Sequence, residues 1–102
     1  MILVTREDNR AVVRPPGQNL VAATLPELRS KMHGILEEGV RELTIDLADV
    51  RMVDSSGLGL LMAANNSLRK LGGKFAVIHA SEDLLALFQS MRMHQHFSVT
   101  GN

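Results

Sequence analysis

The sequence predicts an α/β fold in which an N-terminal β-hairpin is followed by alternating helices and strands. We expect a mixed sheet of four to five strands packed against amphipathic helices. Apolar and polar residues alternate over 43–47, which is the period of a strand with one buried face. Beyond residue 56, leucine and methionine recur at spacings of three and four or their sums, which is the period of a helix. The chain has 102 residues, so we expect one domain over 1–102.

The hairpin is predicted at the start of the chain. Two short β-type runs, 1–5 and 10–14, flank the turn-like Glu7-Asp8-Asn9. Pro15-Pro16-Gly17 ends the second run, because proline donates no hydrogen bond to a sheet and restricts the residue before it.

The first helix is predicted from Thr24. Thr24 and Glu27 have the spacing of a capping box, and Pro26 falls in the first turn, where a missing N–H costs little. Gly39 is the predicted C-terminal end. The apolar stripe of this helix comprises Leu25, Leu28, Met32, Ile35 and Leu36.

The second half of the chain repeats the alternation of helix and strand. A second helix is predicted from Ser55 or Ser56 to about Leu71, where glycines stop it, and an apolar run at 75–78 predicts a central strand that is covered on both faces or at least flanked by neighbours. Ser81 begins a third helix, and 97–99 form a last short strand. This alternation implies right-handed crossovers and parallel pairing of the later strands.

Composition excludes several classes of function. The formal net charge is zero and the chain has three Phe but no Trp or Tyr, so we expect no direct binding to nucleic acid. There is no cysteine, which rules out disulfides, thiolate catalysis and Cys-ligated metals. No apolar run approaches the ~20 residues of a membrane span, and the N-terminus lacks the basic region of a signal peptide, so we expect a cytoplasmic protein without membrane contact.

The stretch Val53-Asp54-Ser55-Ser56-Gly57-Leu58-Gly59 lies between a predicted strand and a predicted helix. Aspartate and serine cap helices because their side-chain oxygens accept hydrogen bonds from the unpaired N–H groups of the first turn. Glycine in that turn lets another surface approach the backbone closely. Two interpretations stay open at this point: a helix cap and nothing more, or a small exposed hydroxyl presented at the positive end of a helix for modification or docking.

This stretch resembles the signature of the STAS domain family, and specifically of bacterial anti-sigma factor antagonists. The match falls on Asp54, Ser55, Ser56, Gly57 and Leu58. It extends through the turn Leu71-Gly72-Gly73-Lys74, the strand after it and the Leu87-Phe88 helix, and covers most of the chain from about Thr24 onward. The resemblance implies a STAS-type fold and a regulatory binding protein that is not an enzyme.

The family resemblance also implies the site residues. The first serine of the motif, here Ser55, is the phosphorylation site for a serine kinase that is itself an anti-sigma factor. We expect Ser56 to be a cap or a supporting hydrogen-bond partner, Asp54 to orient Ser55 or contact the kinase, and Leu60 to be either an exposed contact or a packing residue. The expected partner-binding set is Asp54, Ser55, Ser56, Gly57, Leu58, Gly59 and Leu60.

The resemblance predicts partner switching. Unmodified, the helix starting at Ser55 would dock on the anti-sigma factor kinase and displace a sigma factor; phosphorylation of Ser55 would release it, and a serine phosphatase would reset it. ATP and magnesium belong to the kinase, so we expect no cofactor in this chain. We expect a monomer or a weak homodimer. The first alternative is a STAS subunit that is not switched, in a signalling scaffold or a lipid-transport complex. The second is a STAS domain that binds a small molecule or a nucleotide.

One segment departs from the family pattern. Antagonists often carry an acidic residue shortly after the glycine of a Gly-x-Leu-Asp type segment, whereas this chain has Gly17-Gln18-Asn19-Leu20-Val21. Any kinase contact made by that acidic residue is therefore in question.

Two other sites are disfavoured. Ser55 and His79 suggest a serine hydrolase, but Asp-Ser-Ser-Gly is not the Gly-x-Ser-x-Gly elbow, so His79 is interpreted as a strand-end residue. His94 and His96 suggest a metal site, but an exposed turn before the last strand explains them more simply.

Overall fold

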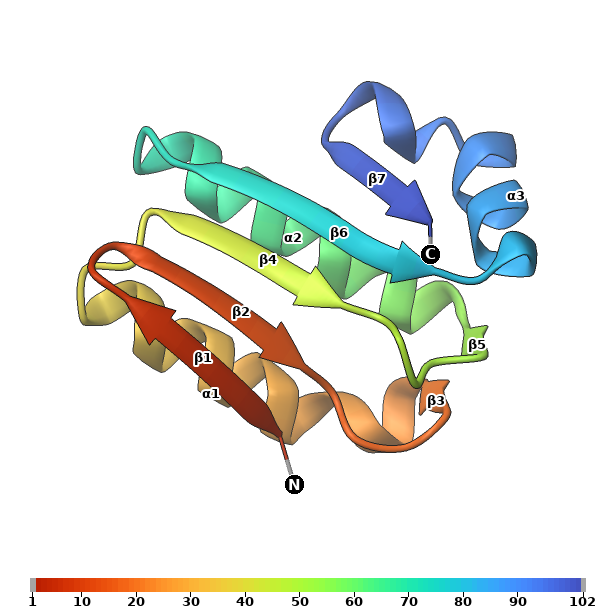
Figure 1. The fold of residues 1–102 in the computed structure, drawn as a ribbon, viewed down its shortest axis with the longest axis horizontal. Helices are drawn as coiled ribbons and strands as arrows, with labels where there is room; N and C mark the ends of the chain where they lie inside the picture. Colours follow the sequence, from red (N-terminus) through yellow and green to blue (C-terminus); the bar gives the residue numbers. More distant parts are fainter. Residues whose placement is uncertain (1, 102) are drawn as a thin grey trace.

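The computed structural model describes residues 2–101, which form a five-stranded sheet with helices packed against it and a small two-stranded sheet (Figure 1). In chain order, the elements are β1 (Leu3–Glu7), β2 (Arg10–Arg14), β3 (Asn19–Leu20), the 3-10 turn η1 (Ala22–Thr24), α1 (Leu25–Glu37), β4 (Glu42–Asp46), β5 (Met52–Val53), α2 (Ser55–Lys70), β6 (Lys74–Ala80), α3 (Glu82–Ser90), the 3-10 turn η2 (Met93–Gln95) and β7 (Ser98–Gly101).

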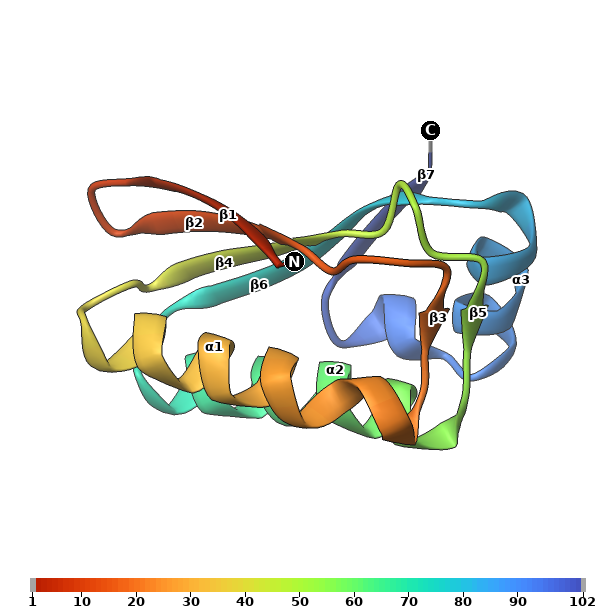
Figure 2. The same ribbon diagram turned by 90° about the horizontal axis from the view of Figure 1, so that it is seen from below.

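The main sheet is mixed, as the sequence predicts. Its five strands lie in the order β1-β2-β4-β6-β7; β1 is antiparallel to β2, and the other neighbours are parallel. Helices α1 and α2 cover one face of this sheet, and α3 lies at its end beside β7 (Figure 2). The N-termini of α1 and α2 therefore meet at the same edge, where the parallel strands end (Figures 1 and 2).

The hydrophobic core fills the space between the sheet and these two helices. Val13, Ile45 and Val77 occupy matching positions on β2, β4 and β6, and each is fully buried. The predicted stripe of α1 is confirmed, although Leu36 is only partly buried. Of the two expectations for the 75–78 strand, coverage on both faces is wrong, because Ile78 is partly exposed. Flanking by neighbours is confirmed, because β6 lies between β4 and β7.

The start of α1 differs from the prediction. The chain enters α1 through η1, and Thr24 makes no side-chain capping hydrogen bond to the helix. The predicted capping box between Thr24 and Glu27 is therefore wrong, although Pro26 does lie in the first turn.

A second, two-stranded sheet was not predicted. It pairs β3 with β5 in parallel, with Leu20 opposite Val53. Each strand has only two residues, too few for the alternation that identifies a strand in a sequence. This small sheet fixes the segment before α1 beside the segment before α2, and so positions the candidate site.

Candidate functional site

The candidate site is the first turn of α2. Asp54 is the N-cap, and its Oδ1 accepts a hydrogen bond of 2.8 Å from the backbone N–H of Gly57. Ser55 is the first helical residue and its side chain is exposed. A hydroxyl thus stands in solvent at the N-terminus of a 16-residue helix, where the helix dipole favours negative charge.

The segment before α1, which consists of β3 and η1 (residues 19–24), packs against this turn and is called the shelf. The backbone N–H of Arg51 donates to the carbonyl of Gln18 at 2.7 Å, and that of Asp54 donates to the carbonyl of Leu20 at 3.3 Å. The second carboxylate oxygen of Asp54 accepts from the backbone N–H of Ala22, also at 3.3 Å. One carboxylate therefore caps the helix and ties it to a segment more than 30 residues earlier.

Gly57 is required by this close approach. A Cβ at Gly57 would lie 2.3 Å from the carbonyl oxygen of Leu20 and 2.8 Å from Cγ1 of Val53. No atom comes within 4 Å of a Cβ built at Gly59. The expectation that a glycine here admits another surface is confirmed for Gly57, and the surface is the β3 backbone.

The predicted contact residues divide by exposure. Ser55, Ser56 and Gly59 are exposed, and Asp54 and Leu58 are partly buried. Gly57 is buried beneath Leu20, so it shapes the turn and offers no surface to a partner.

Leu60 is 4% exposed, and it lines a hollow together with Met32 and Leu36 of α1. Of the two alternatives for Leu60, packing on a neighbouring element is right, and we remove it from the contact surface. Its position off the sheet-facing stripe is explained by α1 rather than by a partner.

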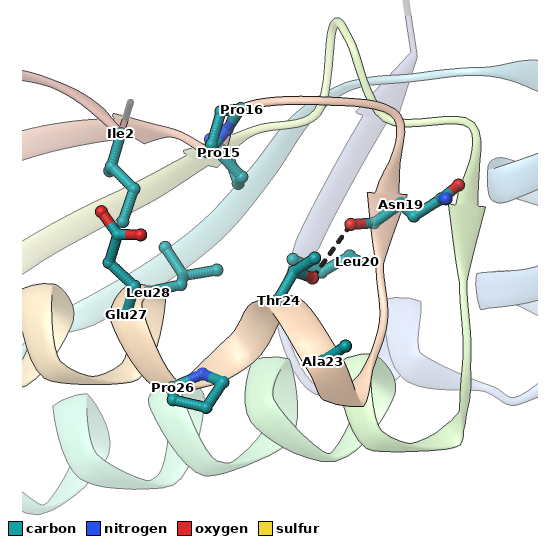
Figure 3. A pocket seen from close by; sticks show the side chains of 10 residues that line it. All are labelled: Ile2, Pro15, Pro16, Asn19, Leu20, Ala23, Thr24, Pro26, Glu27 and Leu28. Atoms are coloured by element: carbon teal, nitrogen blue, oxygen red, sulfur yellow. Dashed lines mark hydrogen bonds between the residues drawn. The ribbon is translucent and has the colours of Figure 1, made fainter.

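A hollow of about 380 Å³ lies on the other side of the shelf (Figure 3). Ile2, Pro15 and Leu28 contribute apolar surface, and the Glu27 carboxylate points toward Ile2. The hydroxyl of Thr24 is hydrogen-bonded to the carbonyl of Asn19 at 3.1 Å across this segment. Little in the sequence indicated that the segment before α1 contributes to the site; the only signal was the departure from the family pattern over residues 17–21.

The residues of the hypothetical hydrolase do not form a triad. His79 Nδ1 lies 2.9 Å from Oδ1 of Asp46, which also accepts from the backbone N–H of Ala48 at 2.9 Å. Asp54 instead binds Gly57 and Ala22. His79 has a φ of 58° where the register between β6 and β7 shifts, one residue before the end of β6, so it is a strand-end residue as expected.

The remaining candidate sites can be placed as well. His94 lies in η2 and His96 just after it, and both are exposed ahead of β7, as the simpler interpretation predicted. Within residues 2–101 no group of three or more His, Asp or Glu side chains is arranged to hold a metal ion. In the same range no helix combines the length and apolar character needed to cross a bilayer.

Comparisons with known proteins agree with this architecture. The chain is 38% identical over 63 residues to an anti-sigma-B factor antagonist of Bacillus subtilis, a match that covers 62% of this chain and 57% of the Bacillus protein. The chain thus spans a little over half the length of that relative.

Two solved structures show the same fold. An anti-sigma factor antagonist from Mycobacterium paratuberculosis superposes with a TM-score of 0.85 at 24% identity, over 100% of this chain and 86% of that one. The Bacillus cell fate determinant SpoIIAA in its phosphorylated form gives a TM-score of 0.77 at 17% identity, over 100% and 92%. The STAS domain model matches residues 2–101, and the chain therefore belongs to the STAS domain family.

Proposed function

We propose that this protein is an anti-sigma factor antagonist: a binding module that docks on a serine kinase acting as an anti-sigma factor and is released when Ser55 is phosphorylated. The Bacillus relative that it matches is named an anti-sigma-B factor antagonist, and one of its structural neighbours is a phosphorylated protein. The protein itself acts by binding and not by catalysis, in the cytoplasm, and a serine phosphatase restores the unmodified form.

The observation that carries this proposal is the exposed hydroxyl of Ser55 on a rigid helix start. A kinase must bring its bound nucleotide up to this hydroxyl, and exposure allows that approach. The cap of Asp54 and the contact of Gly57 with Leu20 hold the turn in place. A pre-organised turn loses little conformational entropy on docking, which favours affinity.

Phosphorylation would change charge more than shape. A phosphoserine carries about −1.5 to −2 charges at pH 7. At the N-terminus of α2 the dipole tolerates this charge, so the domain stays folded. A partner surface that is apolar or acidic at this point is repelled, and each ~1.4 kcal/mol lost lowers the affinity tenfold.

The shelf indicates the kind of contact. The family often has an acidic residue in the segment that corresponds to 17–21, whereas in this chain Val21 is partly exposed and is followed by the exposed Ala22 and Ala23. We infer that the partner meets the shelf through apolar contact, because no side-chain charge is available there for an ionic one.

The test compares the two adjacent serines. Purified kinases of the anti-sigma type from the same genome are incubated with the protein and ATP, and mass spectrometry locates the phosphate. Binding is then measured for the wild type, Ser55→Ala and Ser55→Asp, with Ser56→Asp as the matched control, because it adds the same charge one residue away on the same exposed turn.

We expect phosphate on Ser55, binding by wild type and Ser55→Ala, and at least about tenfold weaker binding by Ser55→Asp than by Ser56→Asp. Phosphate at another residue, or equal binding of Ser55→Ala and Ser55→Asp, would contradict the switch. Constitutive binding without phosphorylation would instead identify the protein as an unswitched STAS subunit.

A further inference from the structure

Two hollows on the helical side of the molecule join into one groove between α1 and α2. The first has a volume of about 220 Å³ and begins at Leu60; the second, of about 430 Å³, ends at Leu71. His33, Leu36 and Ser67 line both hollows, so the two adjoin, and together they form the groove. The two helices lie in one layer and run in the same direction (Figure 2).

The floor of the groove is apolar, and the α2 residues along its side are small. Leu36 is partly buried, and Leu71 is a large hydrophobic residue that is 45% exposed. Ala63, Ala64 and Ser67 on α2 are small and leave room for the side chains of another chain. An exposed apolar surface of this kind favours a partner that covers it.

The rim of the groove is mainly basic. Arg29 stands at one end and Lys70 at the other. Beside Lys70 lies Arg41, which is partly buried and whose Nη1 donates to the backbone carbonyls of Leu36 and Val40. Glu37 is the acidic lining residue, and it lies 2.9 Å from Nε2 of His33. Among the ion pairs found within residues 2–101, none engages Arg29 or Lys70, so both cations face solvent.

We propose that this groove binds an acidic amphipathic helix of a partner protein. Apolar side chains of the helix would occupy the floor, and its flanking carboxylates would meet Arg29 and Lys70. From Leu60 to Leu71 the groove is eleven residues of helix long, or about 16 Å, which matches three turns of a bound helix. This inference does not depend on Ser55, whose side chain lies outside the groove.

The probes are two synthetic peptides of about 14 residues with leucine at positions i, i+3, i+7 and i+10. One carries glutamate beside the leucines and the other carries lysine. Binding is measured by fluorescence anisotropy and located by NMR shifts of the backbone amides. We expect the acidic peptide to bind, with shifts over residues 29–37 and 60–71, and the basic peptide to bind at least about tenfold more weakly.

Variants then test the two features of the groove separately. Lys70→Glu reverses a rim charge, with Lys31→Glu as control, because Lys31 is exposed on α1 at a hollow away from the groove. Ala63→Trp fills the groove, with Ala86→Trp on α3 as control. We expect Lys70→Glu and Ala63→Trp each to weaken binding about tenfold and the controls to change it less than about twofold.

Several outcomes would overturn the proposal: no binding of the acidic peptide at about 1 mM, equal binding of both peptides, shifts confined to other elements, or controls as damaging as the groove variants. Circular dichroism and thermal unfolding of each variant establish that it is folded. Ser55→Asp should bind the acidic peptide like the wild type, which separates this groove from the phosphorylation switch.

Discussion

The starts of α1 and α2 lie side by side at the same edge of the sheet, yet they are built differently. The carboxylate of Asp54 caps α2 and also binds Ala22 of the other segment. Thr24, at the start of α1, has its hydroxyl 2.9 Å from the carbonyl of Val21 and 3.1 Å from that of Asn19, both in its own segment.

This difference shows how a helix start becomes a rigid docking point. The Thr24 side chain at the start of α1 makes only local hydrogen bonds, which an isolated loop could also make. The start of α2 is held by tertiary contacts, because Asp54 and Gly57 both touch the shelf formed by β3 and η1. Substitutions at the start of α2 should therefore lower the free energy of unfolding more than substitutions at the start of α1. They should also disturb the shelf.

The largest effect is expected for Gly57→Ala. The new Cβ would meet the Leu20 carbonyl at 2.3 Å, so backbone must move, and we expect a loss of about 2–4 kcal/mol in the free energy of unfolding. Gly59→Ala is the control: it has open space and should gain about 0.5–1 kcal/mol through helix propensity. Urea unfolding measures both, and similar values for the two would contradict the close approach.

The second largest loss of stability is expected for Asp54→Ala. It removes the cap and the bond to Ala22, for an expected loss of about 2 kcal/mol in unfolding free energy. Asp54→Asn keeps one oxygen for the cap and should lose about half as much. Amide hydrogen exchange at Ala22 should quicken in Asp54→Ala. If exchange quickened only within α2, the tie to the shelf would be refuted.

Substitutions at the start of α1 should lower the free energy of unfolding less than those at the start of α2. Thr24→Val removes the hydroxyl but keeps the shape, and an exposed local hydrogen bond is worth about 0.5–1 kcal/mol. Glu27→Gln should change the unfolding free energy by less than about 0.5 kcal/mol, because Glu27 forms no capping box. Glu27→Ala removes the side-chain oxygens that a capping box would need, and it should also change the unfolding free energy by less than about 0.5 kcal/mol. Thermal unfolding compares the three variants; a loss above about 1 kcal/mol for Glu27→Ala would restore the capping box.

The smallest effect concerns the connection that leads from β4 to α2. The Arg14 guanidinium donates to Asp49 and lowers the pKa of that carboxyl. A lowered folded-state pKa gives stability that is present above the unfolded pKa of about 3.9 and is lost as pH falls through the folded value. The difference in stability between wild type and Asp49→Asn should therefore shrink on acidification. In an Arg14→Gln background this pH dependence should vanish. Its persistence would mean that a group other than Arg14 lowers the pKa of the Asp49 carboxyl.

Periodicity was enough to place the helices. The cap at Asp54 and the end of α2 before Gly72-Gly73 follow from local chemistry, because capping oxygens and stop signals act within one turn. The capping box at Thr24 failed because the chain enters α1 through η1, which turns the hydroxyl toward its own segment. The sequence did not decide between contact and packing for Leu60, because the sequence of one helix does not show which neighbouring element packs against each of its sides.

The amino-acid sequence alone determined the α/β class, the amphipathic helices and the serine at the start of α2, since these depend on residue type and local spacing. The tertiary structure decided that Gly57 is buried under Leu20, that Asp54 reaches Ala22, and that α1 and α2 enclose a basic groove. The first two of these contacts join residues more than 30 positions apart, and the groove joins two separate helices. Only the crossovers that bring the two helix starts to one end of the sheet make these residues neighbours.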